Sequence, residues 1–210
     1  MIRIAIADDH ALIREGVKKI LRRQTDMRLI GEAGNGSELL EILRDVEPNV
    51  LILDITLPGR SGLDLLGDIK RLRPKLAVLV LSMYEEERFA LRVLRSGAAG
   101  YVCKSSAAEQ LVTAIRKVVA GGRYVSPAMA EILASELSGS SEKSGHERLS
   151  NRELQVLCMI GAGKAVKQIA AELAISVNTV STHRARILKK MNMRSTAALI
   201  RYAVEHGLVS

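Results

Sequence analysis

Three carboxylates in the first half of the chain stand where apolar runs end. Asp8 and Asp9 follow the run Ile2–Ala7, and Asp54 follows the run Val50–Leu53. If these runs are neighbouring parallel strands, the carboxylates meet beyond the carboxyl ends of the strands, where open parallel sheets bind their ligands. Like charges that close are unfavourable unless a cation offsets them. Because the set offers oxygen ligands and no Cys or His, we expect it to bind Mg²⁺.

Two later strand ends add a hydroxyl and an ammonium group. Ser82 ends the apolar run Ala77–Leu81, and Lys104 follows the run Gly100–Val102. A lysine ammonium can pair with a phosphoryl oxygen, and the hydroxyl can sense the product. With Asp54 as the nucleophile, and with the metal and Lys104 stabilising charge in the transition state, these groups predict a site that accepts a phosphoryl group.

The elements that must hold these side chains alternate regularly along residues 1–120. Helical patterns separate five candidate strands, which are Ile2–Ala7, Arg28–Ala33, Val50–Leu53, Ala77–Leu81 and Gly100–Val102. Strands that are apolar on both faces and alternate with helices indicate a parallel sheet covered on both sides. We therefore predict an α/β doubly wound domain with a five-stranded parallel sheet over residues 1–120.

Residues 121–147 have the composition of a connection between domains. Pro127–Leu137 predicts a short helix. The following stretch, Ser138–Glu147, is polar and rich in glycine and serine, which predicts a flexible linker.

Residues 148–210 show helical periodicity throughout and predict an all-α four-helix domain. Ser150–Glu153 is a capping box, and Ser176 and Ser195 can cap later helices. The helical patterns Val166–Leu173 and Val177–Met191 are separated by a short turn. This is the spacing of a helix-turn-helix, whose second helix lies in the major groove of DNA.

The charge distribution supports DNA as the partner of the last domain. Of the net charge of +8, +6 lies in residues 146–210, where 10 Lys and Arg face 4 Asp and Glu. Such a basic segment suggests nucleic acid. Aromatic residues make up only 2% of the chain, so bases have few platforms on which to stack, and duplex DNA is the expected form.

The second helix of the motif offers candidates for the DNA contacts. Those on the side that meets base edges are Ser181, Thr182 and Ala185. Those suited to phosphates are Thr179, His183, Arg184, Lys189 and Lys190. Asn178 and Arg186 complete the outward-facing set.

Four motifs of the first half, in their order and spacing, resemble the receiver domain of two-component response regulators. They are IADDH, LILDITLP with the SG that follows, VLS and GYVCK. The resemblance implies a flavodoxin-like fold and a sensor histidine kinase that phosphorylates Asp54. The Mg²⁺ ligands that it implies are Asp9, Asp54 and the carbonyl oxygen of Thr56, with Asp8 assisting through water. The side chains that it implies to respond to the phosphoryl group are Ser82, Tyr101 and Lys104.

The basic third resembles the LuxR-type helix-turn-helix of the NarL/FixJ subfamily over residues 147–210. The stretch LSNRELQVLCMIGAGKAVKQIAAELAISVNTVSTHRARILKKM carries this resemblance. It implies a sequence-specific transcription regulator that binds promoter DNA as a homodimer, with RNA polymerase as a further partner. Three departures, which are Asn178 and Ser181 where lysine is frequent and the short Ala185, predict fewer direct base contacts or a different operator.

The final helix, Thr196–Leu208, supports dimerisation independently. One buried stripe cannot cover all of its apolar positions. These positions are Leu199, Ile200, Tyr202, Ala203 and Val204. The alternative is a four-helix domain that buries both faces of this helix internally.

We therefore predict a response regulator in which phosphorylation of Asp54 controls dimerisation and DNA binding, and not an enzyme. The N-terminus lacks the profile of a signal peptide and no apolar run has membrane-spanning length, so we expect a cytoplasmic protein without a membrane partner.

Three alternatives remain open at this point. The receiver could work independently of phosphorylation, or the C-terminal domain could bind protein instead of DNA. The third is a phosphatase of the haloacid-dehalogenase type. Such enzymes need a second acid two residues after the nucleophile, where this chain has Thr56.

Overall fold

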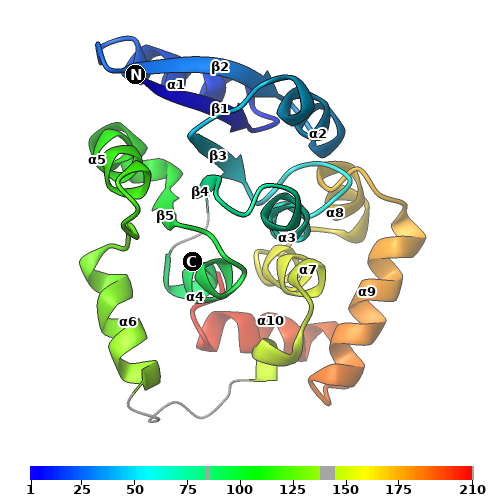
Figure 1. The fold of residues 1–210 in the computed structure, drawn as a ribbon. Coiled ribbons are helices and arrows are strands. Elements are labelled where there is room, and N and C mark those ends of the chain that lie inside the picture. Colours follow the sequence, from blue (N-terminus) through cyan, green and yellow to red (C-terminus); the bar gives the residue numbers. More distant parts are fainter. Residues whose placement is uncertain (84–85, 138–144, 210) are drawn as a thin grey trace. The chain divides into compact units, whose positions relative to one another are not determined.

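The computed structural model describes residues 1–83, 86–137 and 145–209 (Figure 1). The chain forms two compact units, Met1–Ala134 and Ser135–Ser210. The predicted linker Ser138–Glu147 lies outside the described residues up to Ser144. Within the described part of the chain, every helix is too short or too polar to cross a membrane.

The first unit is built on a parallel sheet of five strands in the order β2-β1-β3-β4-β5. The strands are β1 (Ile2–Ala7), β2 (Met27–Ala33), β3 (Val50–Asp54), β4 (Ala77–Ser82) and β5 (Gly100–Cys103). Strand β3 is buried along its whole length, as expected for the centre of a sheet that is covered on both faces. The predicted doubly wound α/β fold is confirmed, and the strand order is that of flavodoxin-like folds.

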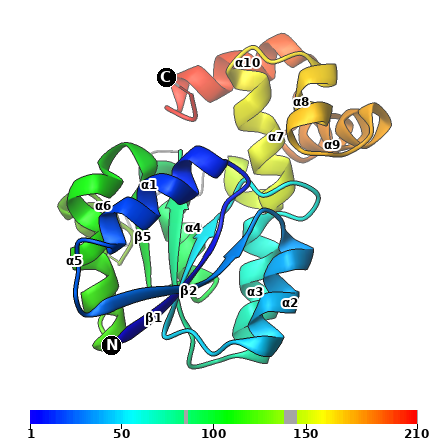
Figure 2. The ribbon, with the colours of Figure 1, turned by 90° about the horizontal axis from the view of Figure 1, so that it is seen from above.

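Helices cover both faces of this sheet. They are α1 (Ala11–Leu21), α2 (Gly36–Asp45), α3 (Gly62–Leu72), α4 (Glu86–Arg95) and α5 (Ala107–Val119). Helices α1 and α5 lie on one side of the strands, and α2 and α3 lie on the other (Figure 2). Val17 of α1 and Leu111 and Ile115 of α5 are buried in one apolar cluster with β1, β3 and β4.

The strand register brings the predicted site residues to one edge of the sheet. Ala7 pairs with Leu53, so the residues that follow β1 lie beside Asp54. Asp54 itself pairs with Leu81, and Ser82 pairs with Cys103. The acidic residues, Ser82 and Lys104 therefore stand at, or just after, the carboxyl ends of their strands, whereas Tyr101 lies within β5.

The first unit extends beyond the predicted boundary at residue 120. The Tyr124 N–H donates to the Ala99 carbonyl oxygen at 2.9 Å, and Tyr124 forms an isolated parallel bridge with Gly100. This segment covers the outer edge of β5 and so satisfies backbone groups that would otherwise be exposed. Helix α6 (Pro127–Leu137) follows, with the bounds that its sequence pattern predicts.

Gly62 allows α3 to begin directly against the end of β3. Its N–H donates to the Ile55 carbonyl oxygen at 3.1 Å. A Cβ atom at this position would lie 2.3 Å from the Asp54 carbonyl oxygen and 2.5 Å from Ile55 Cα. Because both neighbours are backbone atoms, only a glycine fits here without displacing the segment that carries Asp54.

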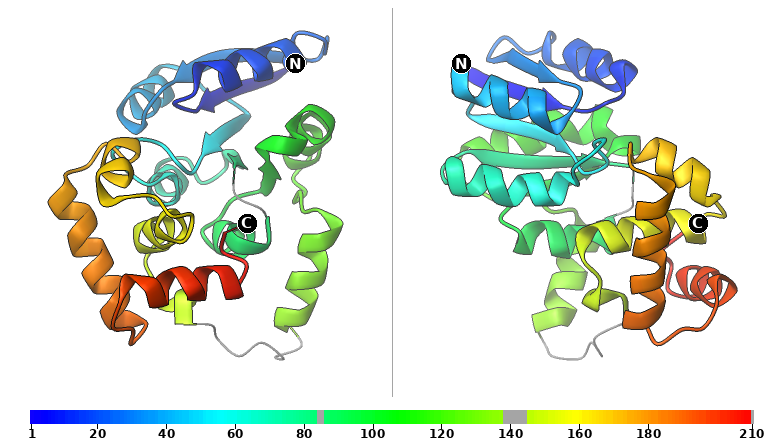
Figure 3. Two further views of the ribbon diagram at one scale, coloured as in Figure 1. Left: turned by 180° about the vertical axis from the view of Figure 1, so that it is seen from behind. Right: turned by 90° about the vertical axis from the view of Figure 1, so that its right-hand side faces the viewer.

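The second unit is helical. The elements among its described residues are a 3₁₀ turn (Gly145–Arg148), α7 (Asn151–Gly161), α8 (Val166–Glu172), α9 (Val177–Lys190) and α10 (Thr196–Glu205). Helix α7 packs against α9 and α10, and α8 packs against α9 (gold to orange in Figure 3). The predicted caps are confirmed, because Ser150, Ser176 and Ser195 accept hydrogen bonds from backbone N–H groups in the first turns of α7, α9 and α10.

A buried carboxylate connects α7 to the end of α9. Glu153 is 3% exposed, and its Oε2 accepts from the Ser150 N–H at 2.7 Å and from Lys190 Nζ at 2.6 Å. Burial alone would raise the pKa of Glu153, but its bonds to Lys190 and Ser150 outweigh that effect and lower the pKa below its ordinary value. The sequence predicted the Ser150–Glu153 capping box but not the ion pair with Lys190.

Replacing Gly62 by alanine should destabilise the protein by about 1–3 kcal/mol, because the new methyl group has to displace backbone. The matched control is Gly67→Ala in the same helix, where a Cβ meets no atom within 4 Å. That change should stabilise the helix by about 0.5–1 kcal/mol. Urea unfolding followed by circular dichroism measures both, and equal midpoints for the two variants would contradict this account of Gly62.

The Glu153→Gln variant should lose about 1–3 kcal/mol of unfolding free energy at pH 7, because the charged hydrogen bond to Lys190 is lost. Since the folded pKa of Glu153 is lowered, its contribution is present above the ordinary value of 4.5 and disappears as the pH falls through the folded pKa. Urea unfolding at pH 7 and at acidic pH should therefore show the two proteins converging at low pH.

The control for this variant is Glu172→Gln. Glu172 pairs with Lys164 at 2.5 Å, but both side chains are more than a third exposed. An exposed pair of this kind should contribute less than about 1 kcal/mol. Similar losses at Glu153 and Glu172 would show that the buried pair has no special role.

Candidate functional site

The structure gathers three carboxylates and one imidazole at the carboxyl edge of the sheet. Asp8, Asp9, His10 and Asp54 each place one potential ligand atom within 4.8 Å of the others. Asp8 and Asp54 are buried, whereas Asp9 is partly exposed. The buried acids thus form the floor of the pocket, and Asp9 and His10 lie at its mouth.

Lys104 bridges the two buried acids. Its Nζ lies 2.6 Å from Asp54 Oδ2 and 2.7 Å from Asp8 Oδ2, and its side chain is 3% exposed. Burial alone would lower the pKa of the Lys104 ammonium, but the charges of Asp54 and Asp8 and the hydrogen bonds to them outweigh it, so the pKa is raised. Lys104 is therefore a cation at neutral pH, fixed where charge on Asp54 would change.

Thr56 holds the other oxygen of Asp54. Its N–H donates to Asp54 Oδ1 at 2.8 Å and its hydroxyl donates to the same atom at 2.6 Å. Only the carbonyl oxygen of Thr56 was predicted to act in the pocket, so the role of its hydroxyl was missed. With Lys104 on Oδ2, these bonds fix the orientation of the Asp54 carboxylate.

Ser82 and Tyr101 are both buried, at 0% and 1% exposure. Ser82 is the last residue of β4, one position beyond the partner of Asp54 in the sheet. Tyr101 lies in β5, three residues before Lys104. A change at Asp54 can therefore reach β5 through two neighbouring strand ends.

His10 is the residue of this pocket that the sequence reasoning missed. Its N–H donates to Asp8 Oδ1 at 2.9 Å, and its Nδ1 lies 2.8 Å from Asp9 Oδ1 and 3.3 Å from Asp8 Oδ1. The structure therefore places a histidine beside the predicted oxygen ligands. The sequence feature that could have identified His10 is its position directly after Asp8 and Asp9, because a residue at the start of the loop after β1 can turn back over the strand end.

The donor set of the pocket fits a divalent cation. Three carboxylates face one ammonium group, so two negative charges are left without compensation from the Lys104 side. Carboxylate oxygens are the ligands that Mg²⁺ prefers. The described residues therefore match both the charge and the ligand type of the predicted ion.

In the helical unit, α9 presents most of the predicted DNA contacts to solvent. The exposed ones are Asn178, Thr179, Thr182, Ala185, Arg186, Lys189 and Lys190, and the half-buried ones are Ser181, His183 and Arg184. The Thr182 hydroxyl donates to the Asn178 carbonyl oxygen at 2.9 Å, and Lys190 is occupied by the ion pair with Glu153. These bonds reduce the number of side chains that are ready to contact DNA.

His183 differs from the other basic candidates. Its Nδ1 is buried and has no hydrogen-bond partner among the described residues. Burial lowers the pKa of the His183 ring, and the positive charges of Arg152 and Arg186 lower it further. The free protein therefore favours the neutral form of this ring, which makes His183 a weaker candidate for a phosphate contact than the exposed Arg186 and Lys189.

The apolar residues of α10 divide into two sets. Leu199 and Ala203 are fully buried in the core of their own domain, and Tyr202 is half-buried, with its hydroxyl 2.9 Å from His146 Nδ1. Ile200 and Val204 are 36% and 59% exposed. The domain therefore does not bury both faces of α10, and only Ile200 and Val204 are directly available for the predicted dimer contact.

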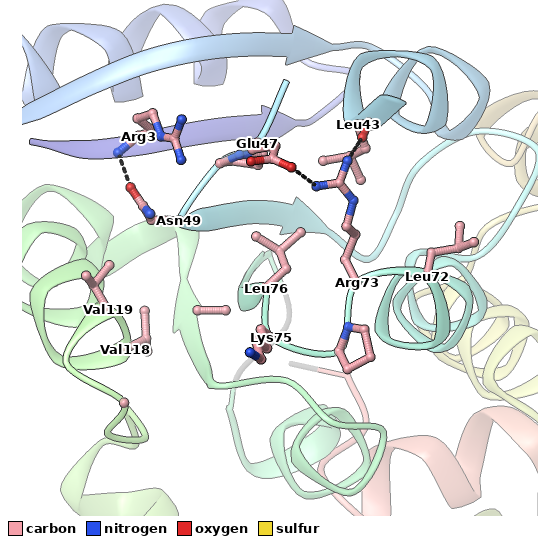
Figure 4. Close-up of a pocket in the computed structure, with 14 residues that line it drawn as sticks. Arg3, Leu43, Glu47, Asn49, Leu72, Arg73, Lys75, Leu76, Val118 and Val119 are labelled. Atoms are coloured by element: carbon pink, nitrogen blue, oxygen red, sulfur yellow. Dashed lines mark hydrogen bonds and ion pairs between the residues drawn. The ribbon is translucent and has the colours of Figure 1, made fainter. Parts of the chain in front are cut away.

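A hollow of about 680 Å³ lies at the opposite edge of the sheet (Figure 4). Arg73 borders it and donates to the Leu43 carbonyl oxygen at 2.7 Å, while Leu76 and Val118 contribute apolar surface. The hollow opens at the amino ends of the strands, and no predicted site residue lines it. It is therefore separate from the acidic pocket.

Comparisons with known proteins match both units. Residues 4–116 match the response regulator receiver domain, and residues 147–203 match the bacterial regulatory proteins of the luxR family. The chain is 36% identical over 210 residues to the response regulator GacA of Pseudomonas aeruginosa, covering 100% of this chain and 98% of the relative. It is 37% identical over 214 residues to the oxygen regulatory protein NreC of Staphylococcus carnosus, covering 99% of each.

A solved structure is also similar over nearly the whole chain. It is RcsB from Salmonella enterica serovar Typhimurium, bound to promoter rprA in the presence of phosphomimetic BeF₃⁻. The TM-score is 0.66 at 27% identity, and the match covers 96% of this chain and 97% of RcsB. The protein belongs to the NarL/FixJ family of response regulators, in which a receiver domain is joined to a LuxR-type helix-turn-helix DNA-binding domain.

Proposed function

We propose that this response regulator is a transcription factor phosphorylated on Asp54 by a sensor histidine kinase, in a reaction that needs Mg²⁺. One observation carries the proposal. Asp54 is a fully buried carboxylate at a strand end, held by Thr56 on one oxygen and by Lys104 on the other. A buried, oriented carboxylate beside a fixed cation is suited to attack a phosphorus atom and to retain the product.

The chemistry is a transfer from a phosphohistidine of the kinase to a carboxylate oxygen of Asp54. An O–P bond forms as the N–P bond breaks, and the electron pair of that bond stays on the histidine nitrogen. Bound Mg²⁺, held by Asp9, Asp54 and the Thr56 carbonyl oxygen with Asp8 assisting through water, would neutralise charge on the phosphoryl oxygens. Lys104 contributes the second positive charge from the buried side of the pocket.

The same contacts suggest how the product is sensed. A phosphoryl group on Asp54 adds charge and three acceptor oxygens next to Lys104 and close to the end of β4. Lys104 and the Ser82 hydroxyl are the groups expected to pair with it, and Tyr101 lies on the strand that precedes Lys104. We propose that this rearrangement controls dimerisation through α10 and the affinity of α9 for promoter DNA.

The DNA-binding half of the proposal rests on the exposed basic side chains of α9. RcsB, which is similar over nearly the whole chain, has been solved on a promoter, and this supports duplex DNA as the ligand. Homodimerisation would double the number of phosphate contacts and match a symmetric operator. At a promoter, RNA polymerase is the partner through which such a regulator would act.

Incubation with Mg²⁺ and acetyl phosphate should add one phosphoryl group to the wild-type protein and none to Asp54→Ala, because the nucleophilic carboxylate is lost. Intact-mass spectrometry measures the addition. Asp64→Asn removes an exposed carboxylate from α3 and should leave the addition unchanged. Modification of both wild type and Asp54→Ala, or of neither, would refute Asp54 as the acceptor.

The logarithm of the binding constant for a random-sequence duplex should fall linearly with the logarithm of the salt concentration, since phosphate contacts release counterions. Lys189→Ala should reduce that slope by about 1, because it removes one exposed phosphate contact. Fluorescence anisotropy over a range of NaCl concentrations measures the slope. Lys75→Ala, in the receiver, serves as the control and should leave it unchanged.

The same titrations separate the alternatives. Salt-independent binding would favour a domain that recognises protein instead of DNA. Equal duplex affinities before and after phosphorylation would mean that the receiver acts independently of phosphorylation.

A further inference from the structure

His10 extends the acidic pocket with a nitrogen donor. Its Nδ1 lies 2.8 Å from Asp9 Oδ1 and 3.3 Å from Asp8 Oδ1, and it belongs to the same group of potential ligand atoms as Asp54. The ring is 59% exposed, so it stands on the solvent side of the pocket, opposite the buried Lys104. The backbone of His10 is fixed by the bond from its N–H to Asp8 Oδ1.

We propose that His10 is an additional metal ligand and that it strengthens the binding of divalent transition-metal ions, such as Co²⁺, Ni²⁺ or Zn²⁺, relative to that of Mg²⁺. This inference rests on the proposed function, because it concerns the same cation site. It adds a nitrogen ligand, which widens the preference for these ions that carboxylates alone already give.

The spacing of the donor atoms supports a shared ion. Adjacent ligands of an octahedral ion with bonds of about 2.1 Å lie about 3 Å apart. The separations between His10 Nδ1 and the two aspartate oxygens, 2.8 and 3.3 Å, bracket this value. The same distances are those of hydrogen bonds, so an ion that binds here would replace the contacts between the His10 ring and the two carboxylates.

The arrangement also keeps the two cations of the pocket apart. Lys104 contacts the Oδ2 atoms of Asp8 and Asp54, whereas His10 faces the Oδ1 atoms of Asp8 and Asp9. An ion at the mouth of the pocket can thus use oxygens that Lys104 leaves available. Its binding does not require the buried ammonium to move.

The chemistry of the ligand determines the preference. Mg²⁺ binds oxygen ligands and gains little from an imidazole, whereas Co²⁺, Ni²⁺ and Zn²⁺ bind imidazole strongly. Loss of the ring should therefore weaken the binding of these ions and leave the Mg²⁺ affinity nearly unchanged. If His10 only oriented Asp9 by a hydrogen bond, its loss would lower the affinity for every ion that Asp9 binds.

The test measures Co²⁺ and Mg²⁺ binding to the full-length protein by isothermal titration calorimetry, together with the visible absorption of bound Co²⁺. His10→Ala should lower the Co²⁺ affinity about tenfold or more, since even the loss of a residue that only orients a ligand has an effect of this size. It should change the Mg²⁺ affinity less than about threefold. The Co²⁺ absorption band should shift as the nitrogen ligand is replaced by water.

A second variant, His10→Asn, distinguishes a ligand from a positioning residue. The asparagine amide can still donate a hydrogen bond to Asp9 but offers no imidazole nitrogen. The proposal expects His10→Asn to lose Co²⁺ affinity as His10→Ala does. Restoration of Co²⁺ binding by asparagine, or equal losses of Co²⁺ and Mg²⁺ affinity in His10→Ala, would overturn it.

Two controls locate the binding event. Asp9→Ala should lower the affinity for both ions, and this result would place them in the pocket. His206→Ala removes an exposed histidine of the helical unit and should leave the Co²⁺ affinity in the pocket unchanged. Wild-type protein that binds neither ion would refute the proposed magnesium site together with this inference. Mg²⁺ binding without any Co²⁺ preference that depends on His10 would overturn this inference alone.

Discussion

The receiver depends on one buried ammonium group, Lys104 Nζ, held between the carboxylates of Asp54 and Asp8. Withdrawing ions from water costs several kcal/mol each, so the arrangement is stable only when opposite charges lie in contact and the remaining oxygens are also bonded. Thr56 donates the further hydrogen bonds that Asp54 needs. The opposite charges lie in contact because parallel strands bring all three chain segments to the same edge of the sheet.

This constraint explains the tight geometry around the site. Helix α3 begins so close to β3 that a Cβ on Gly62 would collide with the Asp54 carbonyl group. A carboxylate that is held by its backbone, by Thr56 and by Lys104 has little freedom of its own. A new charge on Asp54 must therefore be accommodated by movement of its neighbours, and this property makes the pocket suitable as a switch.

The helical unit uses charge in a different way. Its net charge of +6 over residues 146–210 overstates what can face DNA, because several cations are engaged internally. Lys190 is paired with the buried Glu153, and Arg152 donates to Gln155 and to the Leu173 carbonyl oxygen. The ion pair holds α9 against α7, and the bond from Arg152 to Leu173 holds α7 against the end of α8. The exposed side chains of Arg186 and Lys189 are left as better candidates for phosphate contacts than Lys190 or the half-buried His183.

The sequence by itself determined the parts that depend on local pattern. These include the bounds of β1 and α6, the three capping serines and the strand ends that carry Asp8, Asp54, Ser82 and Lys104. Only the tertiary structure decided that Lys190 pairs with Glu153 and that Leu199 is buried while Val204 is exposed. It also decided that Tyr124 returns to β5 and that the His10 ring turns toward Asp9. Hydrophobic periodicity and capping act within a few residues, whereas ion pairs, burial and side-chain orientation depend on which distant segments meet.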